Sequence, residues 1–230
     1  MLRSLKKRLK KESAYYLMLF LIYIGSLIPR SLVLPLGKLI GFAAYKLLPK
    51  PRRKALKNLN SAIGMKFNAE EIHEICRRNF EHWAISLFEV IGLLKVKTVQ
   101  DLNSKVKVRN LELLNESLKD GKGVILLTPH LGNWEIAAAY LSLMGYKFAV
   151  LAKEVYDLRL NSILLKIRGG RKIVNIPRDS IFTAVKYLKT GYILGILPDQ
   201  ATNVSGIYIN FFHKPAYTPI GPAKLSIKTK

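Results

Sequence analysis

A histidine and a glutamate lie five positions apart in the segment 128–135, which reads TPHLGNWE. On one regular helix, five residues correspond to about 140° of rotation, so the two side chains would not face each other. With His130 in a loop and Glu135 in the first turn of a following helix, the chain can curl back. Glu135 would then accept the proton on Nδ1 of His130 and leave Nε2 free as a base.

Such a base would take the proton from an alcohol, whose oxygen then attacks a thioester without an intervening protein nucleophile. Backbone N–H groups near 132–134 would help to hold the oxyanion. On this hypothesis, Glu135→Ala lowers turnover by orders of magnitude with little effect on folding. The alternative is that His130 caps the helix and Glu135 interacts with the helix dipole, and the residues alone leave both open.

Two more polar residues follow apolar runs farther along the chain. Asp199 comes directly after a predicted buried strand, in the sequence LPDQ. If the sheet is parallel, Asp199 and His130 lie at the same edge, outside the carboxyl ends of the strands, where ligands bind. Arg168 could hold a phosphate or a carboxylate through two parallel hydrogen bonds. Taken alone, a solvated arginine and a loop aspartate are the simpler interpretations.

From about residue 105 onward, short apolar runs alternate with amphipathic stretches closed by glycines. We predict strands over 106–109, 124–128, 148–152, 172–176, 192–197 and 207–212. We predict helices over 111–119, 134–144, 158–167, 180–189 and 219–228. Strands that alternate with helices indicate an α/β fold with a largely parallel sheet flanked by helices.

The N-terminal part is both the most basic and the most apolar part of the chain. Residues 1–60 hold 14 basic residues and one acidic residue, which gives 13 of the 23 net positive charges. Basic residues that flank the apolar stretches 14–28 and 32–48 are typical of a membrane surface. Fifteen uncharged residues fall short of the roughly 20 that a full span needs. We therefore predict an uncleaved anchor, either one short membrane helix or two helices lying in the interface.

The segment between the anchor and the α/β part is predicted to be helical. A short basic helix covers 54–63, and a strongly amphipathic helix covers about 69–94, with Asn68 and Glu71 as a capping box. His73 and His82 lie on the second helix without another ligand at metal spacing, so we expect no metal site there. The predicted organisation is a basic N-terminus and membrane anchor over 1–50, a helical segment over 51–100, and an α/β domain over 101–230.

The net charge of +23 would draw the chain to a polyanion, such as nucleic acid, an anionic membrane surface or an acidic protein. No helix-turn-helix signature, zinc spacing or strand motif of an RNA-binding domain is found, so nucleic acid is not the predicted partner. The sequence contains no G-x-G-x-x-G or P-loop, and we predict no cofactor. The single cysteine, Cys76, excludes an intrachain disulfide.

Several of these segments, taken in order, resemble the late lipid A acyltransferases, which add secondary lauroyl or myristoyl chains to lipid A precursors. The family belongs to the wider lysophospholipid acyltransferase superfamily, with a glycerolipid acyltransferase-like fold. The resemblance covers about residues 15–225 and is most specific in GKGVILLTPHLGNWE, at 121–135, together with the later Asp199-Gln200 and the run 206–219. The basic stretch 52–59 and the helix 78–89 also match.

The resemblance implies that His130 and Glu135 form the catalytic dyad and that Arg168 and Asp199 are further site residues. We assign Arg168, Asp199, Gln200 and Asn133 to substrate binding. The implied donor is acyl-acyl carrier protein, with acyl-CoA possible, and the implied acceptor is a hydroxyl of a lipid A precursor or of a related glycolipid such as an acylated mannoside. Attachment to the inner membrane, with the active site on its cytoplasmic side, is also implied.

Two departures qualify the resemblance. Glycerol-phosphate acyltransferases of the superfamily usually have Asn before the His and Asp at the fifth place, where this chain has Pro129 and Glu135. That branch is therefore disfavoured. Members of the family usually continue for about one more strand–helix–strand set, so the α/β domain is expected to be short at its C-terminus. The alternative hypothesis is a catalytically inactive, basic protein that binds membrane surfaces.

Overall fold

The computed structural model describes residues 2–153, 157–200 and 203–229. These residues form two compact units, 1–95 and 96–230. The boundary between the units follows Lys95, at the end of a short 3-10 helix, Leu93–Lys95.

The first unit is entirely helical. It consists of α1 (Leu2–Leu27), α2 (Arg30–Leu47), α3 (Pro49–Ile63) and α4 (Ala69–Gly92). The predicted capping box of α4 is confirmed: Glu71 N–H donates to Asn68 Oδ1 at 2.9 Å, and Asn68 N–H donates to Glu71 Oε2 at 2.8 Å. These bonds satisfy backbone donors that the first turn of a helix leaves without intrahelical partners, so α4 begins where the sequence indicated.

Helices α2 and α4 pack at very short range because two glycines of α2 face α4. A Cβ added to Gly41 would lie 2.2 Å from Glu81 Cα, and one added to Gly37 would lie 2.5 Å from a side-chain carbon of Ile85. Small residues let two helix backbones approach closely, as the spacing G-x-x-x-G does in membrane proteins.

The membrane segment predicted within residues 1–50 is not confirmed by the length and composition of the helices. None of the described helices has, by itself, an apolar stretch long enough to cross a bilayer. Ser31–Leu47 and Pro49–Ile63, which are bent by 93° at their junction, meet the requirement only as a pair, and Tyr15–Leu27 is a shorter apolar helix.

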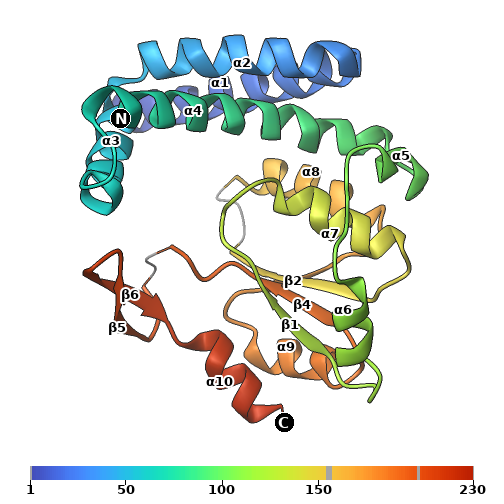
Figure 1. The fold of residues 1–230 in the computed structure, drawn as a ribbon. Coiled ribbons are helices and arrows are strands. Elements are labelled where there is room, and N and C mark those ends of the chain that lie inside the picture. The colour runs from blue at the N-terminus through green and yellow to red at the C-terminus, as the bar shows by residue number, and fades with distance from the viewer. Residues whose placement is uncertain (1, 154–156, 201–202, 230) are drawn as a thin grey trace. The chain divides into compact units, whose positions relative to one another are not determined.

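The second unit contains the predicted parallel sheet. Its strands are β1 (Val124–Leu127), β2 (Phe148–Ala152), β3 (Val174–Pro177) and β4 (Ile193–Ile196), and all neighbouring strands run parallel in the order β1-β4-β2-β3. The helices of this unit are α5 (Gln100–Asn103), α6 (Leu111–Ser117), α7 (Trp134–Leu143), α8 (Leu158–Gly169), α9 (Ile181–Leu188) and α10 (Gly221–Lys228). Helices α7 and α8 lie over one face of the sheet, and α9 and α10 lie over the other (Figure 1).

Alternation along β4 divides the hydrophobic core between the two faces. Ile193 packs with Phe148 and Ala138, whereas Leu194 packs with Leu188 and Leu225. All four residues of β4 are buried, as expected for an interior strand covered on both faces.

One predicted strand is not formed, and one strand was not predicted. Residues 106–109 do not form a strand; only Val106 is half-buried, and the segment pairs with no other described strand. The second hairpin strand, β6 (Lys214–Pro219), was missed, and it pairs antiparallel with β5 (Gly206–Phe211). The two-residue turn is made by Phe212 and His213, with φ of 49° and 60°, and it lacks the Asn-Gly or Asp-Gly sequence that usually signals such a turn.

Candidate active site

The loop between β1 and α7 positions His130 at the carboxyl end of the parallel sheet. Thr128 N–H still donates to Ile196 O at 3.1 Å, so the ladder with β4 extends one residue past β1. The chain then turns through Gly132, whose φ of +69° suits glycine, and α7 begins at Trp134. Asn133 is the N-cap of α7, and its Oδ1 accepts a hydrogen bond from Ile136 N–H at 3.3 Å.

The register between β1 and β4 brings Asp199 to His130. Leu127 is paired with Ile196, and each of the two polar residues follows three positions after its member of that pair. One carboxylate oxygen of Asp199 lies 2.7 Å from Nδ1 of His130, and the other accepts a hydrogen bond from His130 N–H at 2.7 Å. The two contacts fix both the backbone and the ring of His130.

The charge state of Asp199 determines which nitrogen of His130 carries the proton. Partial burial acts to raise the pKa of the Asp199 carboxyl, but hydrogen bonds from the backbone N–H and the ring of His130 outweigh it and hold this pKa below its usual range. Asp199 is therefore a carboxylate, which can only accept, and Nδ1 is the donor. The ring of His130 also meets the ring of Trp134 edge-on, with 4.8 Å between centroids. Nε2 is left as the basic nitrogen.

Glu135 does not form the hydrogen bond to His130 that the sequence predicted. Its carboxylate is buried and accepts from two nitrogens of the Arg168 guanidinium, from Nε at 2.9 Å and from Nη2. Arg168 Nη1 also donates to Asn175 Oδ1 at 2.6 Å. The first turn of α7 directs Glu135 into the interior, and the strand register places a different carboxylate beside Nδ1. The bidentate contact expected of Arg168 is made, but its partner is a carboxylate of the chain itself.

A cavity of about 520 Å³ opens beside His130. Glu135, Arg168 and Gln200 also line it, whereas Asp199 lines a second cavity of about 320 Å³. Much of its remaining wall is apolar and comes from the strands, α7 and the segment after β4: Leu126, Leu127, Ala137, Ala138, Phe148, Val150, Leu151 and Leu197. Its volume is within the range of small-molecule sites, roughly 300–1,000 Å³. Asn133 is not among the described residues that line it.

Two cations of this cavity, Lys153 and Arg178, were missed by the sequence analysis. They follow β2 and β3 directly, and they are neighbours because Ala152 is paired with Pro177 and Arg178 N–H donates to Ala152 O at 3.0 Å. The sequence does contain a signal for them. Each is the first charged residue after a predicted strand, and ligands bind at the carboxyl ends of strands in such sheets. Their relation to each other depended on the order of the strands.

Within the described part of the chain, no three or more His, Cys, Asp or Glu side chains are grouped so that they could hold a metal ion. The site presents an oriented imidazole next to a cavity with polar and apolar walls.

Comparison with known proteins identifies one family over nearly the whole chain. The family model described as bacterial lipid A biosynthesis acyltransferase matches residues 3–230. Lipid A biosynthesis acyltransferase 2 of Shigella flexneri is 29% identical over 179 residues, which cover 76% of this chain and 55% of that protein. Lipid A biosynthesis myristoyltransferase of Escherichia coli (strain K12) is 25% identical over 170 residues, covering 72% of this chain and 51% of that protein.

A second group of relatives carries a different name. Phosphatidylinositol mannoside acyltransferase of Mycobacterium tuberculosis (strain CDC 1551 / Oshkosh) is 24% identical over 127 residues, covering 53% of this chain and 40% of that protein. The chain thus spans about half the length of the curated relatives that it matches. With the family model matched from residue 3 to residue 230, the chain belongs to the bacterial lipid A biosynthesis acyltransferase family.

Proposed function

We propose that this protein transfers a fatty acyl chain from acyl-acyl carrier protein, or from acyl-CoA, to a hydroxyl of a glycolipid. The observation that carries the proposal is the orientation of His130, whose Nδ1 is held by the Asp199 carboxylate at a cavity with largely apolar walls. Membership of the family and the names of the relatives support acyl transfer to a lipid A precursor or to a phosphatidylinositol mannoside.

In the proposed reaction, Nε2 of His130 removes the proton from the acceptor hydroxyl while its oxygen attacks the thioester carbonyl carbon. The resulting oxyanion is stabilised by the positive end of the α7 dipole, since α7 begins four residues after His130. The C–S bond then breaks, and the leaving thiolate takes the proton back from the imidazolium. Asp199 stabilises that imidazolium and keeps the ring in its reactive orientation.

Glu135 and Arg168 have a different part in this proposal from the one that the sequence suggested. Because they neutralise each other in a buried pair, neither is the direct partner of the base. Both side chains line the cavity. Gln200 is exposed and lines the cavity, where its amide can donate to or accept from a sugar hydroxyl.

Lys153 and Arg178 supply positive charge for a phosphate of the donor or acceptor. Two cations that line the same cavity repel each other, and an anion between them would offset this repulsion. Arg178 has a buried Nε without a hydrogen-bond partner among the described residues, and its ion pair to Asp179 is long, at 3.6 Å. A phosphate would satisfy both side chains.

We also propose that the protein attaches through residues 1–50 to the cytoplasmic face of the inner membrane. Large apolar side chains on α1 and α2 are exposed, for example Tyr16, Leu17, Phe20, Leu34 and Leu39. Exposed apolar surface next to many cations is what a helix lying in a membrane interface requires.

The direct test is acyl transfer in membranes, with labelled acyl-acyl carrier protein and either a tetra-acylated lipid A precursor or a phosphatidylinositol mannoside. Wild type should transfer the label, and His130→Ala should not. The matched control is His213→Asn, which removes an exposed imidazole from the β5–β6 turn and retains a residue that tolerates its positive φ. Absence of transfer by wild type to both acceptors would favour the inactive membrane-surface protein.

A further inference from the structure

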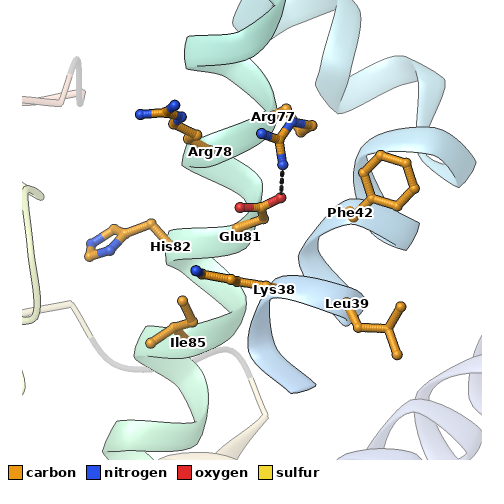
Figure 2. A pocket seen from close by; sticks show the side chains of 8 residues that line it. All are labelled: Lys38, Leu39, Phe42, Arg77, Arg78, Glu81, His82 and Ile85. Carbon is orange, nitrogen blue, oxygen red and sulfur yellow. Dashed lines mark hydrogen bonds and ion pairs between the residues drawn. The ribbon is translucent and has the colours of Figure 1, made fainter. Parts of the chain in front are cut away.

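A groove in the first unit has no part in the reaction proposed above. It lies between α2 and α4 and has a volume of about 660 Å³. Lys38, Leu39 and Phe42 line it from α2, and Arg77, Arg78, Glu81, His82 and Ile85 line it from α4 (Figure 2). Both helices are held in place by the close glycine contacts, so the groove has a rigid frame.

The polar lining of the groove is predominantly positive. Lys38, Arg77 and Arg78 are cations, and Glu81 is the one lining carboxylate among the described residues. Glu81 is buried and is paired with Arg77, which also donates to Glu74 through Nε at 2.8 Å. The negative charge of Glu81 is therefore neutralised by Arg77. Lys38 and Arg78, which binds Glu74 through one nitrogen, are the other cations that line the groove.

Arg78 retains capacity for a ligand. It donates to Glu74 through Nε at 2.7 Å, and its side chain is 73% exposed. Among the described residues, no contact of its two terminal nitrogens is seen, and these nitrogens form the edge that grips a phosphate in a bidentate contact. Lys38 is exposed on the facing helix and adds a point charge.

The same groove has an apolar side. In Figure 2, Arg78, His82 and the Lys38 amino group lie on one side of Glu81, whereas Phe42 and Leu39 lie on the other side. Leu39 and Phe42 are 63% and 41% exposed. Lys46, one turn after Phe42, holds its amino group 5.5 Å from the Phe42 ring centre. A cationic side next to an exposed apolar side matches an amphiphile that has a negative head and a hydrocarbon tail.

We propose that this groove binds the phosphate head of an anionic phospholipid, with Lys38 and Arg78 holding the phosphate and Leu39 and Phe42 contacting its acyl chains. The inference rests on the membrane attachment proposed above and specifies where a lipid head is recognised. A phospholipid is favoured over an acidic protein because the apolar side adjoins exposed apolar residues along α2, such as Leu34, Ile40 and Leu47.

The test measures binding of the full chain to vesicles of phosphatidylcholine containing phosphatidylglycerol, and to vesicles of phosphatidylcholine alone, without any acyl donor. Lys38→Ala/Arg78→Ala should weaken binding to the anionic vesicles by about tenfold, because the charge-assisted hydrogen bonds from these two side chains to the phosphate are lost. The conservative variant Lys38→Arg, with Arg78 unchanged, should bind the anionic vesicles as wild type does. The matched control is Lys54→Ala/Lys57→Ala, which removes two exposed cations of α3 in the same unit.

An equal loss in the control would mean that the attraction is general, and the groove would not be a site. Inorganic phosphate is then added at the concentration of the lipid phosphate. Displacement of the protein from the vesicles would mean that the groove recognises the free ion. If the double variant bound vesicles normally but lost binding to acyl carrier protein, the groove would be a dock for an acidic protein. Each of these results would overturn the proposal.

The experiment is independent of the proposed reaction. His130→Ala should bind vesicles as wild type does, because its site lies in the other unit. Acyl transfer with normal vesicle binding in Lys38→Ala/Arg78→Ala would refute only the lipid groove. If wild type transferred no acyl chain but the double variant lost vesicle binding, only the proposed reaction would be refuted.

Discussion

For single residues, the most consequential contact is the pair of hydrogen bonds between Asp199 and His130. Asp199→Asn should lower kcat by about 10³–10⁴-fold because an amide no longer fixes the reactive tautomer or stabilises the imidazolium. KM should change little, since Asp199 does not line the cavity beside Nε2. Steady-state kinetics test this, with the exposed Asp120→Asn as the control. A wild-type kcat in Asp199→Asn would remove this residue from the mechanism.

The buried pair of Glu135 and Arg168 makes a different prediction from the one drawn from sequence. Each side chain is 10% exposed, so Glu135→Ala leaves a buried guanidinium without its carboxylate and should destabilise the fold by roughly 3–5 kcal/mol. Urea denaturation measures this free energy of unfolding. Replacing both residues by methionine should cost much less, because no uncompensated charge remains. If Glu135→Ala instead retained its stability and lost its turnover, the original catalytic role of Glu135 would be correct.

For whole elements, the packing of α2 on α4 depends on Gly41. A Cβ at this position would lie 2.2 Å from a backbone atom of Glu81, and neither helix can yield without a backbone shift. Gly41→Ala should therefore destabilise the first unit by about 1–3 kcal/mol. Gly92→Ala is the control: nothing lies within 4 Å of its added Cβ, and the helical position should gain roughly 0.5–1 kcal/mol. Thermal melts of the two variants should shift in opposite directions.

Helix α4 also carries a charge cluster that makes its stability depend on pH. A hydrogen bond from Arg77, and a weaker effect of one from Arg78, lower the pKa of Glu74 from 4.5 to about 2. A carboxyl whose pKa is lowered by folding contributes stability above its unfolded pKa and loses it as the pH falls through the folded value. The difference in melting temperature between wild type and Glu74→Gln should thus be largest near pH 6 and should shrink below about pH 4. A difference that stayed constant with pH would mean that the ion pairs contribute nothing to stability.

For the molecule as a whole, charge and chemistry are divided between two compact units. The first 60 residues hold most of the net positive charge, whereas the oriented histidine, its aspartate and the cavity all belong to residues 96–230. The proposed reaction and the proposed lipid groove can therefore be tested separately. The composition suggested a boundary near residue 50 and another near residue 100, and the compact units meet after Lys95.

Local signals determined much of this structure. The capping box at Asn68 set the start of α4, the apolar runs set the four parallel strands, and the segment 121–135 indicated the family and placed His130 after a strand. Each of these features depends on neighbours in the sequence or on hydrophobic periodicity, which a single sequence records directly. The hairpin strand β6 escaped because its turn uses Phe212 and His213 instead of the residues that usually adopt positive φ.

The partners of the site residues were decided only by the tertiary structure. The sequence placed Asp199 and His130 at one edge of the sheet, but strand order and register were needed to bring the Asp199 carboxylate, 69 positions away, onto Nδ1. The register between β2 and β3 made Lys153 and Arg178 neighbours, and the packing of α7 and α8 paired Glu135 with Arg168. A sequence reports which side chains can ionise and roughly where strands end. Which of them meet depends on long-range strand pairing and on the rotation of the first turn of α7, because hydrogen bonds act only at short distance.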